Sequence, residues 1–261
     1  MRKARNGERG VLGREQFTIR PADLGCVQTM NSLYAKTRLV CAAAICMIAC
    51  ASIPPGAGLP TTSETLGDLT IQIQVEPDAS LDSAIAGLKK LYFMCYPQLL
   101  KRFENPNKPA SRTVTLVLIP DYPWPAASSG NRIMINLTAL RRAPTDIGYL
   151  VHELAHVVQA YPVYEPGWLT EGIADVARAQ YTPHSDPFWS MPQKMQPDWS
   201  YQSGYGIAAS FLTWLETRHT GIVDVLHRKM QNGHFKIELF AELTGKDADA
   251  LWSECVSELG K

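Results

Sequence analysis

The chain has 261 residues, of which 46% are hydrophobic and 19% charged, which is enough apolar material for the core of one domain of ordinary size. Its formal net charge is zero, but residues 1–49 carry eight Lys and Arg against three Asp and Glu, so residues 50–261 are mildly acidic. No basic stripe with interleaved aromatic residues occurs in this sequence, which argues against nucleic acid as a partner.

The first part of the chain has the plan of an export signal. Residues 1–29 are polar and arginine-rich without helical or alternating periodicity, and we expect them to be a non-native extension, with translation starting at Met30. Residues 30–49 read as a signal peptide, because basic residues precede an apolar run, 39–49, that is too short to span a bilayer. The alternative is a buried apolar helix of the fold, which the Pro-Gly sequence after it disfavours.

Residues 47–50 read MIAC and resemble the lipobox of bacterial lipoproteins, with methionine in place of the usual leucine. The resemblance implies that Cys50 is lipidated and anchors the protein to a membrane. The protein would then be located in the bacterial periplasm or cell envelope. Cleavage near Ala51 or Ser52 is the alternative and would release a secreted protein. Residues 50–67 are rich in Ala, Pro, Gly, Ser and Thr, and we expect them to form a flexible linker.

The folded domain is expected to span residues 68–261. Alternating apolar residues predict strands, and an apolar period of 3.6 residues predicts a helix that starts at Leu81 and is interrupted by Pro97. Cys95 and Cys255 could form a bridge in an oxidising compartment or remain separate buried thiols, because the sequence cannot place them within bridging distance. The predicted strands are residues 69–75, 113–119 and 132–136.

Residues 152–156 read HELAH. On a helix, positions four residues apart share one face, so His152 and His156 can bind one zinc ion. Glu153 lies where its carboxylate can reach a water molecule on the metal, which makes it the candidate general base. We expect this helix to be capped by Thr145. The alternative is a chance pattern on an amphipathic helix.

A catalytic zinc site usually takes three protein ligands and keeps one position open. Glu171 is the next candidate, since the fourteen residues between His156 and Glu171 leave room for a loop and a second helix. Asp175 lies one turn further on the same face and could accept a hydrogen bond from the non-ligating nitrogen of His152. The alternative for Glu171 is a solvated helix carboxylate.

The stretches 151–159 (VHELAHVVQ), 166–178 (PGWLTEGIADVAR) and 205–216 (YGIAASFLTWLE) together resemble the basic secretory protein family, metallopeptidases of plants and bacteria, and more broadly the gluzincins. The resemblance implies an α+β fold with a small N-terminal sheet and helices, a helical C-terminal half, and the zinc cleft between them. It also implies that the strand before the zinc helix, residues 132–136, pairs with an extended substrate.

Residues 181–203 are dense in Pro and aromatic residues, and we expect a loop over the cleft. Tyr205 is the preferred candidate for the hydroxyl that stabilises the oxyanion, ahead of Tyr201, although an aromatic packed at a helix start is an equal alternative. His184 could line the loop, whereas the remaining histidines after residue 218 have no ligand spacing. Four further helices are predicted over 205–218, 222–230, 235–243 and 248–259.

These patterns predict a zinc-dependent metallopeptidase that binds one Zn²⁺ and hydrolyses peptide or protein substrates outside the cytoplasm. Two alternatives remain open at this point. One is an envelope-anchored module, binding or cell-wall-associated, whose zinc is structural and which cleaves nothing. The other is a metal-free domain with a chance motif. The open coordination expected for two histidines and one glutamate favours the enzyme, since structural zinc sites are usually closed by four protein ligands.

Overall fold

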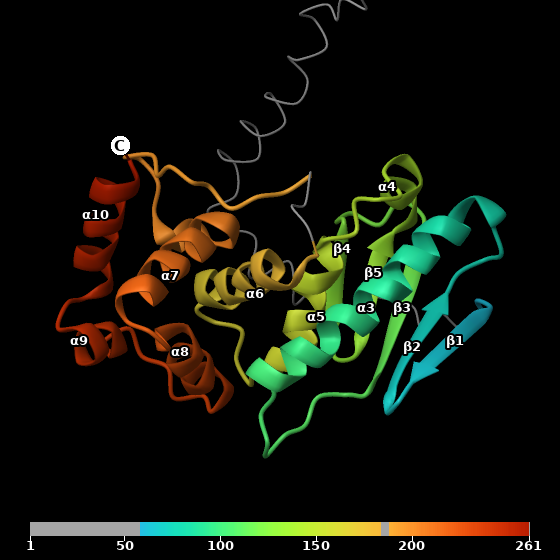
Figure 1. Ribbon diagram of the computed structural model, residues 1–261, viewed down its shortest axis with the longest axis horizontal. Coiled ribbons are helices and arrows are strands. Elements are labelled where there is room, and N and C mark those ends of the chain that lie inside the picture. Colours follow the sequence, from blue (N-terminus) through green and yellow to red (C-terminus); the bar gives the residue numbers. More distant parts are fainter. Residues whose placement is uncertain (1–57, 184–187, 261) are drawn as a thin grey trace, which may run out of the picture. The chain divides into compact units, whose positions relative to one another are not determined.

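The computed structural model describes residues 58–183 and 188–260. They form the predicted α+β fold, in which a sheet with helices is followed by a helical half (Figure 1). The elements in chain order are β1 (Thr61–Leu66), β2 (Leu69–Gln74), the 3₁₀ turn η2 (Ala79–Leu81), α3 (Asp82–Phe103), β3 (Thr113–Ile119), β4 (Ala126–Ser129), β5 (Arg132–Asn136), α4 (Leu137–Arg142), α5 (Tyr149–Gln159), α6 (Gly167–Tyr181), the 3₁₀ turn η3 (Tyr201–Ser203), α7 (Tyr205–Arg218), α8 (Ile222–Gln231), α9 (Leu239–Thr244) and α10 (Ala248–Leu259).

The predicted extension, the signal peptide and the lipobox at Cys50 lie outside the described residues, as do the first part of the linker and His184. Within residues 58–183 and 188–260, none of the helices combines the length and the apolar character that crossing a bilayer requires.

The sheet has five strands in the order β1-β2-β3-β5-β4. The inner pairs β2–β3 and β3–β5 are parallel, and both outer pairs are antiparallel. Strand β2 alternates as predicted, with Leu69, Ile71 and Ile73 buried. The central strand β3 is buried at five consecutive positions, which is typical of a parallel strand covered on both faces.

The predicted linker over residues 50–67 is wrong in its last part, because Thr61–Leu66 form the edge strand β1. All six residues are exposed, so this strand has no buried face and leaves no alternation of apolar and polar residues in the sequence. It is held instead by the antiparallel ladder to β2, which the sequence of β1 alone does not reveal.

Helix α3 continues through Pro97 to Phe103, contrary to the predicted interruption. A proline inside a helix costs about 3 kcal/mol, because it removes one hydrogen bond and clashes with the preceding turn. The residues beyond it include Leu99 and Phe103, which are almost fully buried, and each buried side chain of this size contributes about 1.5–3 kcal/mol. Burial of the last turns therefore offsets the proline.

Strand β5 is an inner strand, so the expectation that residues 132–136 pair with an extended substrate is wrong. One of its edges is bonded to β3 and the other to β4. The edge strand on this side is β4, a short segment of Ala and Ser that was not predicted because it carries no alternating apolar residues. Any peptide that extends the sheet here must pair with β4.

Helix α5 connects the sheet to the helical half. It contacts α3 and β4 on one side and α6 on the other, and α6 packs in turn on α7 (Figure 1). The predicted helices of the C-terminal half are present. The helices α7 and α10 have the expected bounds, α8 ends one residue later, and α9 begins at Leu239 rather than at residue 235. Cys95 on α3 and Cys255 on α10 are both buried free thiols.

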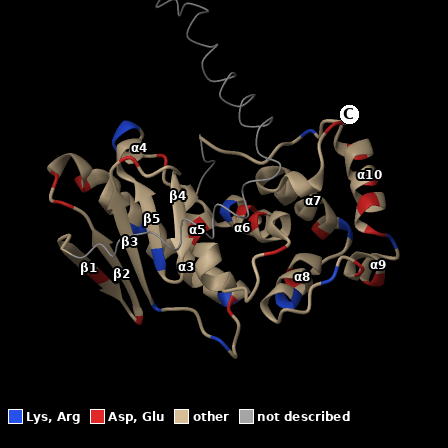
Figure 2. Ribbon diagram, turned by 180° about the vertical axis from the view of Figure 1, so that it is seen from behind, with Lys and Arg blue, Asp and Glu red and all other residues tan. Residues whose placement is uncertain are grey.

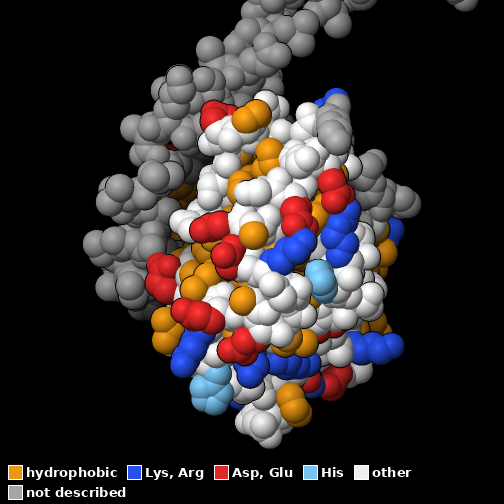
Figure 3. Space-filling model, turned by 90° about the vertical axis from the view of Figure 1, so that its left-hand side faces the viewer, with side chains coloured by type: hydrophobic (Ala, Val, Ile, Leu, Met, Phe, Trp, Pro, Cys, Tyr) orange, Lys and Arg blue, Asp and Glu red, His pale blue; other side chains and the backbone are white. Residues whose placement is uncertain are grey.

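The surface over the C-terminal helices carries acidic and basic side chains side by side (Figure 3). Two of these contacts are ion pairs, Arg218 with Glu258 and Lys246 with Glu254. Such exposed pairs contribute at most about 1 kcal/mol each, so the fold depends on the buried core rather than on them.

His227 on α8 is fully buried and joins three parts of the fold. Its Nε2–H donates to the carbonyl of Phe103 at 2.7 Å, and Nδ1 accepts from the Tyr161 hydroxyl at 2.8 Å. Because burial disfavours the charged ring, the pKa of His227 falls to about 4. The folded protein therefore holds this ring neutral over most of the accessible pH range.

We expect the free energy of unfolding to fall as the pH decreases from about 6.5 to about 4, because the unfolded chain binds the His227 proton in that window and the folded chain does not. This residue contributes roughly 2 kcal/mol to the loss between pH 7 and pH 5, from 1.36 kcal/mol per pKa unit. Urea unfolding at both pH values measures it. The variant His227→Gln should be less stable at pH 7 but should lose less stability on acidification, and equal losses in both proteins would contradict the assignment.

Candidate metal centre

Helix α5 carries the two histidines. It begins at Tyr149 rather than after Thr145, because residues 143–146 form a turn in which the Asp146 N–H donates to the Ala143 carbonyl. Its apolar residues, among them Leu150 and Leu154, are buried in the core. This packing fixes the rotation of the helix, so that its two histidines face α6.

Helix α6 supplies Glu171 and Asp175 and lies between α5 and α7. Gly172 permits the close approach of α7, since a Cβ at that position would lie 2.8 Å from the Cβ of Ala208. Glu171 and Asp175 are both buried, which is unusual for carboxylates that have no partner. Both carboxylates are turned toward α5.

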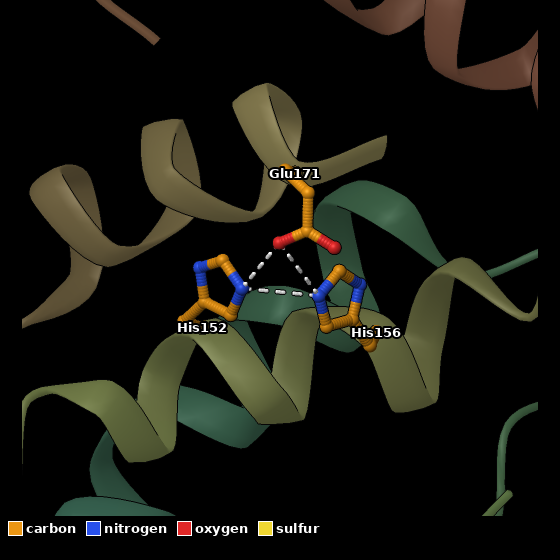
Figure 4. Close-up of side chains that lie close together, drawn as sticks. All are labelled: His152, His156 and Glu171. Carbon is orange, nitrogen blue, oxygen red and sulfur yellow. Dashed lines mark hydrogen bonds and ion pairs between the residues drawn. The ribbon is translucent and has the colours of Figure 1, made fainter. Parts of the chain in front are cut away.

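His152, His156 and Glu171 meet between these helices (Figure 4). The two Nε2 atoms lie 3.0 Å apart, and Glu171 Oε2 lies 3.0 Å from Nε2 of His152 and 3.6 Å from Nε2 of His156. The three side chains come from two helices and point at a common centre. The structure thus brings together all three ligands predicted from the sequence.

These separations fit one metal ion. In a tetrahedral zinc site with bonds of ~2.0–2.1 Å, neighbouring ligand atoms lie roughly 3.3 Å apart. The three distances in the structure bracket that value. Two imidazoles and one carboxylate are also the donor set of catalytic zinc sites that keep a fourth position open.

The outer nitrogens of both histidines are bound by oxygen acceptors. His152 Nδ1–H donates to Oδ1 of Asp175 at 2.7 Å, which is the contact predicted from the sequence. His156 Nδ1–H donates to Oε1 of Gln159, also at 2.7 Å. In both rings the proton is therefore on Nδ1, and Nε2 is left with its lone pair toward the centre, as a metal ligand requires.

The electrostatics of the cluster call for a positive charge. Burial by itself would lower the pKa of His152, but Asp175 and Glu171 raise it well above its ordinary value. The pKa of His156 is likewise raised, since Glu171 outweighs burial. Burial would raise the pKa of Glu171, but the two histidines hold it well below its usual range. Figure 2 shows the acidic residues on both α5 and α6. A bound cation would balance the negative charge of these carboxylates, which protons on the histidines balance otherwise.

The candidate general base, Glu153, is 7% exposed and lies beside the first histidine on α5. Its carboxylate makes no hydrogen bond or ion pair with any residue in the described part of the chain. Its charge is one of the causes that raise the pKa of His156, the candidate ligand on the same helix.

Tyr205, the first residue of α7, lies at the rim of the site. Its ring is nearly parallel to that of His152, with ring centroids 6.2 Å apart, and the residue is 52% exposed. Its backbone has φ of 48°, a left-handed conformation that is uncommon for a residue other than glycine. The other candidate, Tyr201, is buried, and its hydroxyl donates to Asp249 on α10.

Two residues of the site were not predicted from the sequence. Gln159 binds His156 and also donates from Nε2 to the Thr170 carbonyl at 3.1 Å. Tyr164 donates its hydroxyl to Oε1 of Glu171 at 2.6 Å. Gln159 lies three residues after His156 on the same helix, and this spacing could have predicted the contact between the two side chains. No comparable signal exists for Tyr164, which lies in a loop.

Residues 89–255 match the model of the family BSP, described as peptidase of plants and bacteria. The matched segment contains both histidines, Glu171 and Asp175, and it extends from α3 to α10. A search among curated proteins finds no match to the chain. The family match confirms the resemblance drawn from the residues of the two helices that form the candidate metal site.

Proposed function

The chain belongs to the BSP family of peptidases of plants and bacteria, and from this premise we propose that it is an exported zinc-dependent peptidase. The observation that carries the proposal is the convergence of His152, His156 and Glu171 on one centre, with ligand atoms 3.0–3.6 Å apart. A structural role for the metal would call for a fourth protein ligand. Among the described residues, the group of side chains that could hold a metal consists of these three.

Zinc is the proposed metal because imidazole and carboxylate ligands in a site with an open position suit it well. When bound, it would supply a Lewis acid that polarises the scissile carbonyl and lowers the pKa of a water ligand. Glu153, which has no hydrogen-bond partner among residues 58–183 and 188–260, would take a proton from the attacking water and deliver it to the leaving amine. The Tyr205 hydroxyl would donate to the oxygen on which negative charge develops.

Among the described strands β4 is the last of the sheet, and an extended peptide could align beside the candidate metal site by adding a strand to its outer edge. Strand β4 contacts α5, the helix that carries both histidines, and it pairs with β5 along its other edge. Main-chain hydrogen bonds to a sheet edge bind peptides with little regard to sequence. The small Ala and Ser side chains of β4 leave room for larger substrate side chains.

The test is a measurement of zinc content combined with a broad peptide-library assay, with and without a chelator. The proposal expects one zinc per chain and cleavage that stops on chelation and returns with zinc. Stoichiometric zinc without cleavage would favour a binding module. Absence of bound metal would leave only a chance motif.

Export and lipid anchoring are part of the proposal and are supported by the sequence of residues 30–50 alone. Mass spectrometry of the mature N-terminus in a bacterial host provides the test. We expect a chain that begins at Cys50 and carries added acyl mass. A mature protein that retains residues 2–20 would exclude both the signal peptide and the start at Met30, whereas an unmodified N-terminus near Ala51 would indicate a secreted form.

A further inference from the structure

The loop between α5 and α6 links two of the metal ligands through a chain of hydrogen bonds. This series of hydrogen bonds starts at His156, whose Nδ1–H donates to Gln159, and Gln159 donates to the Thr170 carbonyl. The Thr170 hydroxyl donates to the carbonyl of Tyr164 at 2.7 Å. The Tyr164 hydroxyl then donates to Glu171. Each member of the chain thus fixes the position of the next, from one ligand to the other.

Because of the last hydrogen bond in this series, the two carboxylate oxygens of Glu171 have different neighbours. Oε1 lies 2.6 Å from the Tyr164 hydroxyl, whereas Oε2 faces the Nε2 atoms of both histidines. A metal ion at the common centre would therefore meet one oxygen of the carboxylate. A rotation of the carboxylate that turned the other oxygen toward the metal would break its hydrogen bond with the tyrosine.

The position of Tyr164 is built into the fold by a second, independent contact. Gly167 starts α6 directly beneath the tyrosine ring, and a Cβ there would lie 2.8 Å from Cε1 of Tyr164. The absence of a side chain at residue 167 thus permits the ring to lie close to the helix. Together with the Thr170 hydrogen bond, this close contact places the hydroxyl at Glu171.

We propose that Tyr164 is a positioning residue that restricts Glu171 to binding the metal through a single oxygen. The inference rests on the metal site of the proposed function. It adds that the hydrogen bond from Tyr164 determines the coordination number of the bound metal. A carboxylate bound through both oxygens would take a further coordination position, and a catalytic zinc site needs one position for water. The hydrogen bond from Tyr164 keeps that position open.

The test uses the full chain with Co²⁺ in place of zinc, because Co²⁺ absorbs visible light much more strongly in four-coordinate than in five-coordinate sites. In Tyr164→Phe, we expect the visible absorption to weaken as Glu171 binds through both oxygens. We also expect zinc affinity, measured by chelator competition, to fall by about 10- to 100-fold, as is usual when an outer hydrogen bond to a ligand is removed.

Tyr161→Phe is the matched control. It removes a tyrosine hydroxyl from the same loop, but that hydroxyl binds His227 and not a ligand. The Co²⁺ spectrum of this variant should equal that of the unmodified protein. Gly167→Ala is a second variant, which keeps the Tyr164 hydroxyl and displaces its ring, and it should weaken the absorption as Tyr164→Phe does.

A Co²⁺ spectrum unchanged in Tyr164→Phe would overturn the inference, even if the affinity for zinc fell. If Tyr164→Phe does not fold, an unchanged spectrum in Gly167→Ala would overturn it equally. Either result leaves the proposed function intact, since the unmodified protein would still bind one metal ion. Failure of the unmodified protein to bind metal would instead refute the proposed function.

Discussion

Glu153→Gln is expected to keep the metal and lose turnover. The amide has nearly the shape of the carboxylate but cannot accept a proton from the attacking water. Loss of a general base typically costs about 10²- to 10⁴-fold in rate. The structure supports this separation of roles, because Glu153 is not among the three residues whose ligand atoms converge on the centre.

The measurement is peptide cleavage at saturating substrate, together with zinc content and melting temperature. Glu242→Gln makes the same chemical change at an exposed position on α9 and should leave all three unchanged. Cleavage by Glu153→Gln at the rate of the unmodified protein would remove Glu153 from the mechanism. Loss of zinc in that variant would make Glu153 part of the metal site itself.

Glu171→Ala is expected to abolish metal binding and the stability that depends on it. Alanine removes one of the three proposed ligands and leaves the two histidine Nε2 atoms, 3.0 Å apart, without the carboxylate oxygen that faces both of them. The loss of zinc affinity should exceed the roughly 10- to 100-fold that removal of an outer hydrogen bond causes. A metal at a free concentration of a thousand times its Kd stabilises a folded protein by about 4 kcal/mol, so the difference is measurable as a shift in Tm.

The unmodified protein should melt at a lower temperature after treatment with a chelator and recover on addition of zinc. Glu171→Ala should show the same melting temperature with zinc as without it. Glu254→Ala on α10 removes a carboxylate from an exposed ion pair with Lys246 and should respond to zinc as the unmodified protein does. Binding of one zinc by Glu171→Ala with unchanged affinity would exclude Glu171 as a ligand.

The candidate site could be predicted from the sequence to the extent that it depends on helical spacing. Residues four apart share a helix face whatever the fold around them, so His152 with His156 and Glu171 with Asp175 could be paired directly. That the two pairs face each other was inferred from the length of the connecting segment and from the resemblance. The α+β class is what the resemblance implies, and the apolar periods of β2, β3 and most helices agree with it.

Predictions of secondary structure from the sequence are wrong where an element has no apolar period or where long-range contacts outweigh a local preference. Strands β1 and β4 lie at the two sheet edges, and their sequences carry no alternation of apolar and polar residues. Burial of Leu99 and Phe103 carries α3 through Pro97. The position of β5 inside the sheet depends on pairings across the chain, and these made β4 the edge strand next to the metal helix.

The sequence by itself determined which residues pair on each helix of the candidate metal centre, because periodicity along a helix is a local property of the chain. Only the tertiary structure decided how the ligands are held. The tautomer of His156 depends on Gln159, and the choice of oxygen at Glu171 depends on Tyr164, which reaches it through a loop whose course is set by packing against α6. The hydrogen bond of 2.6 Å from Tyr164 to Glu171 requires the loop to be placed by the whole fold, and residue spacing alone cannot specify it.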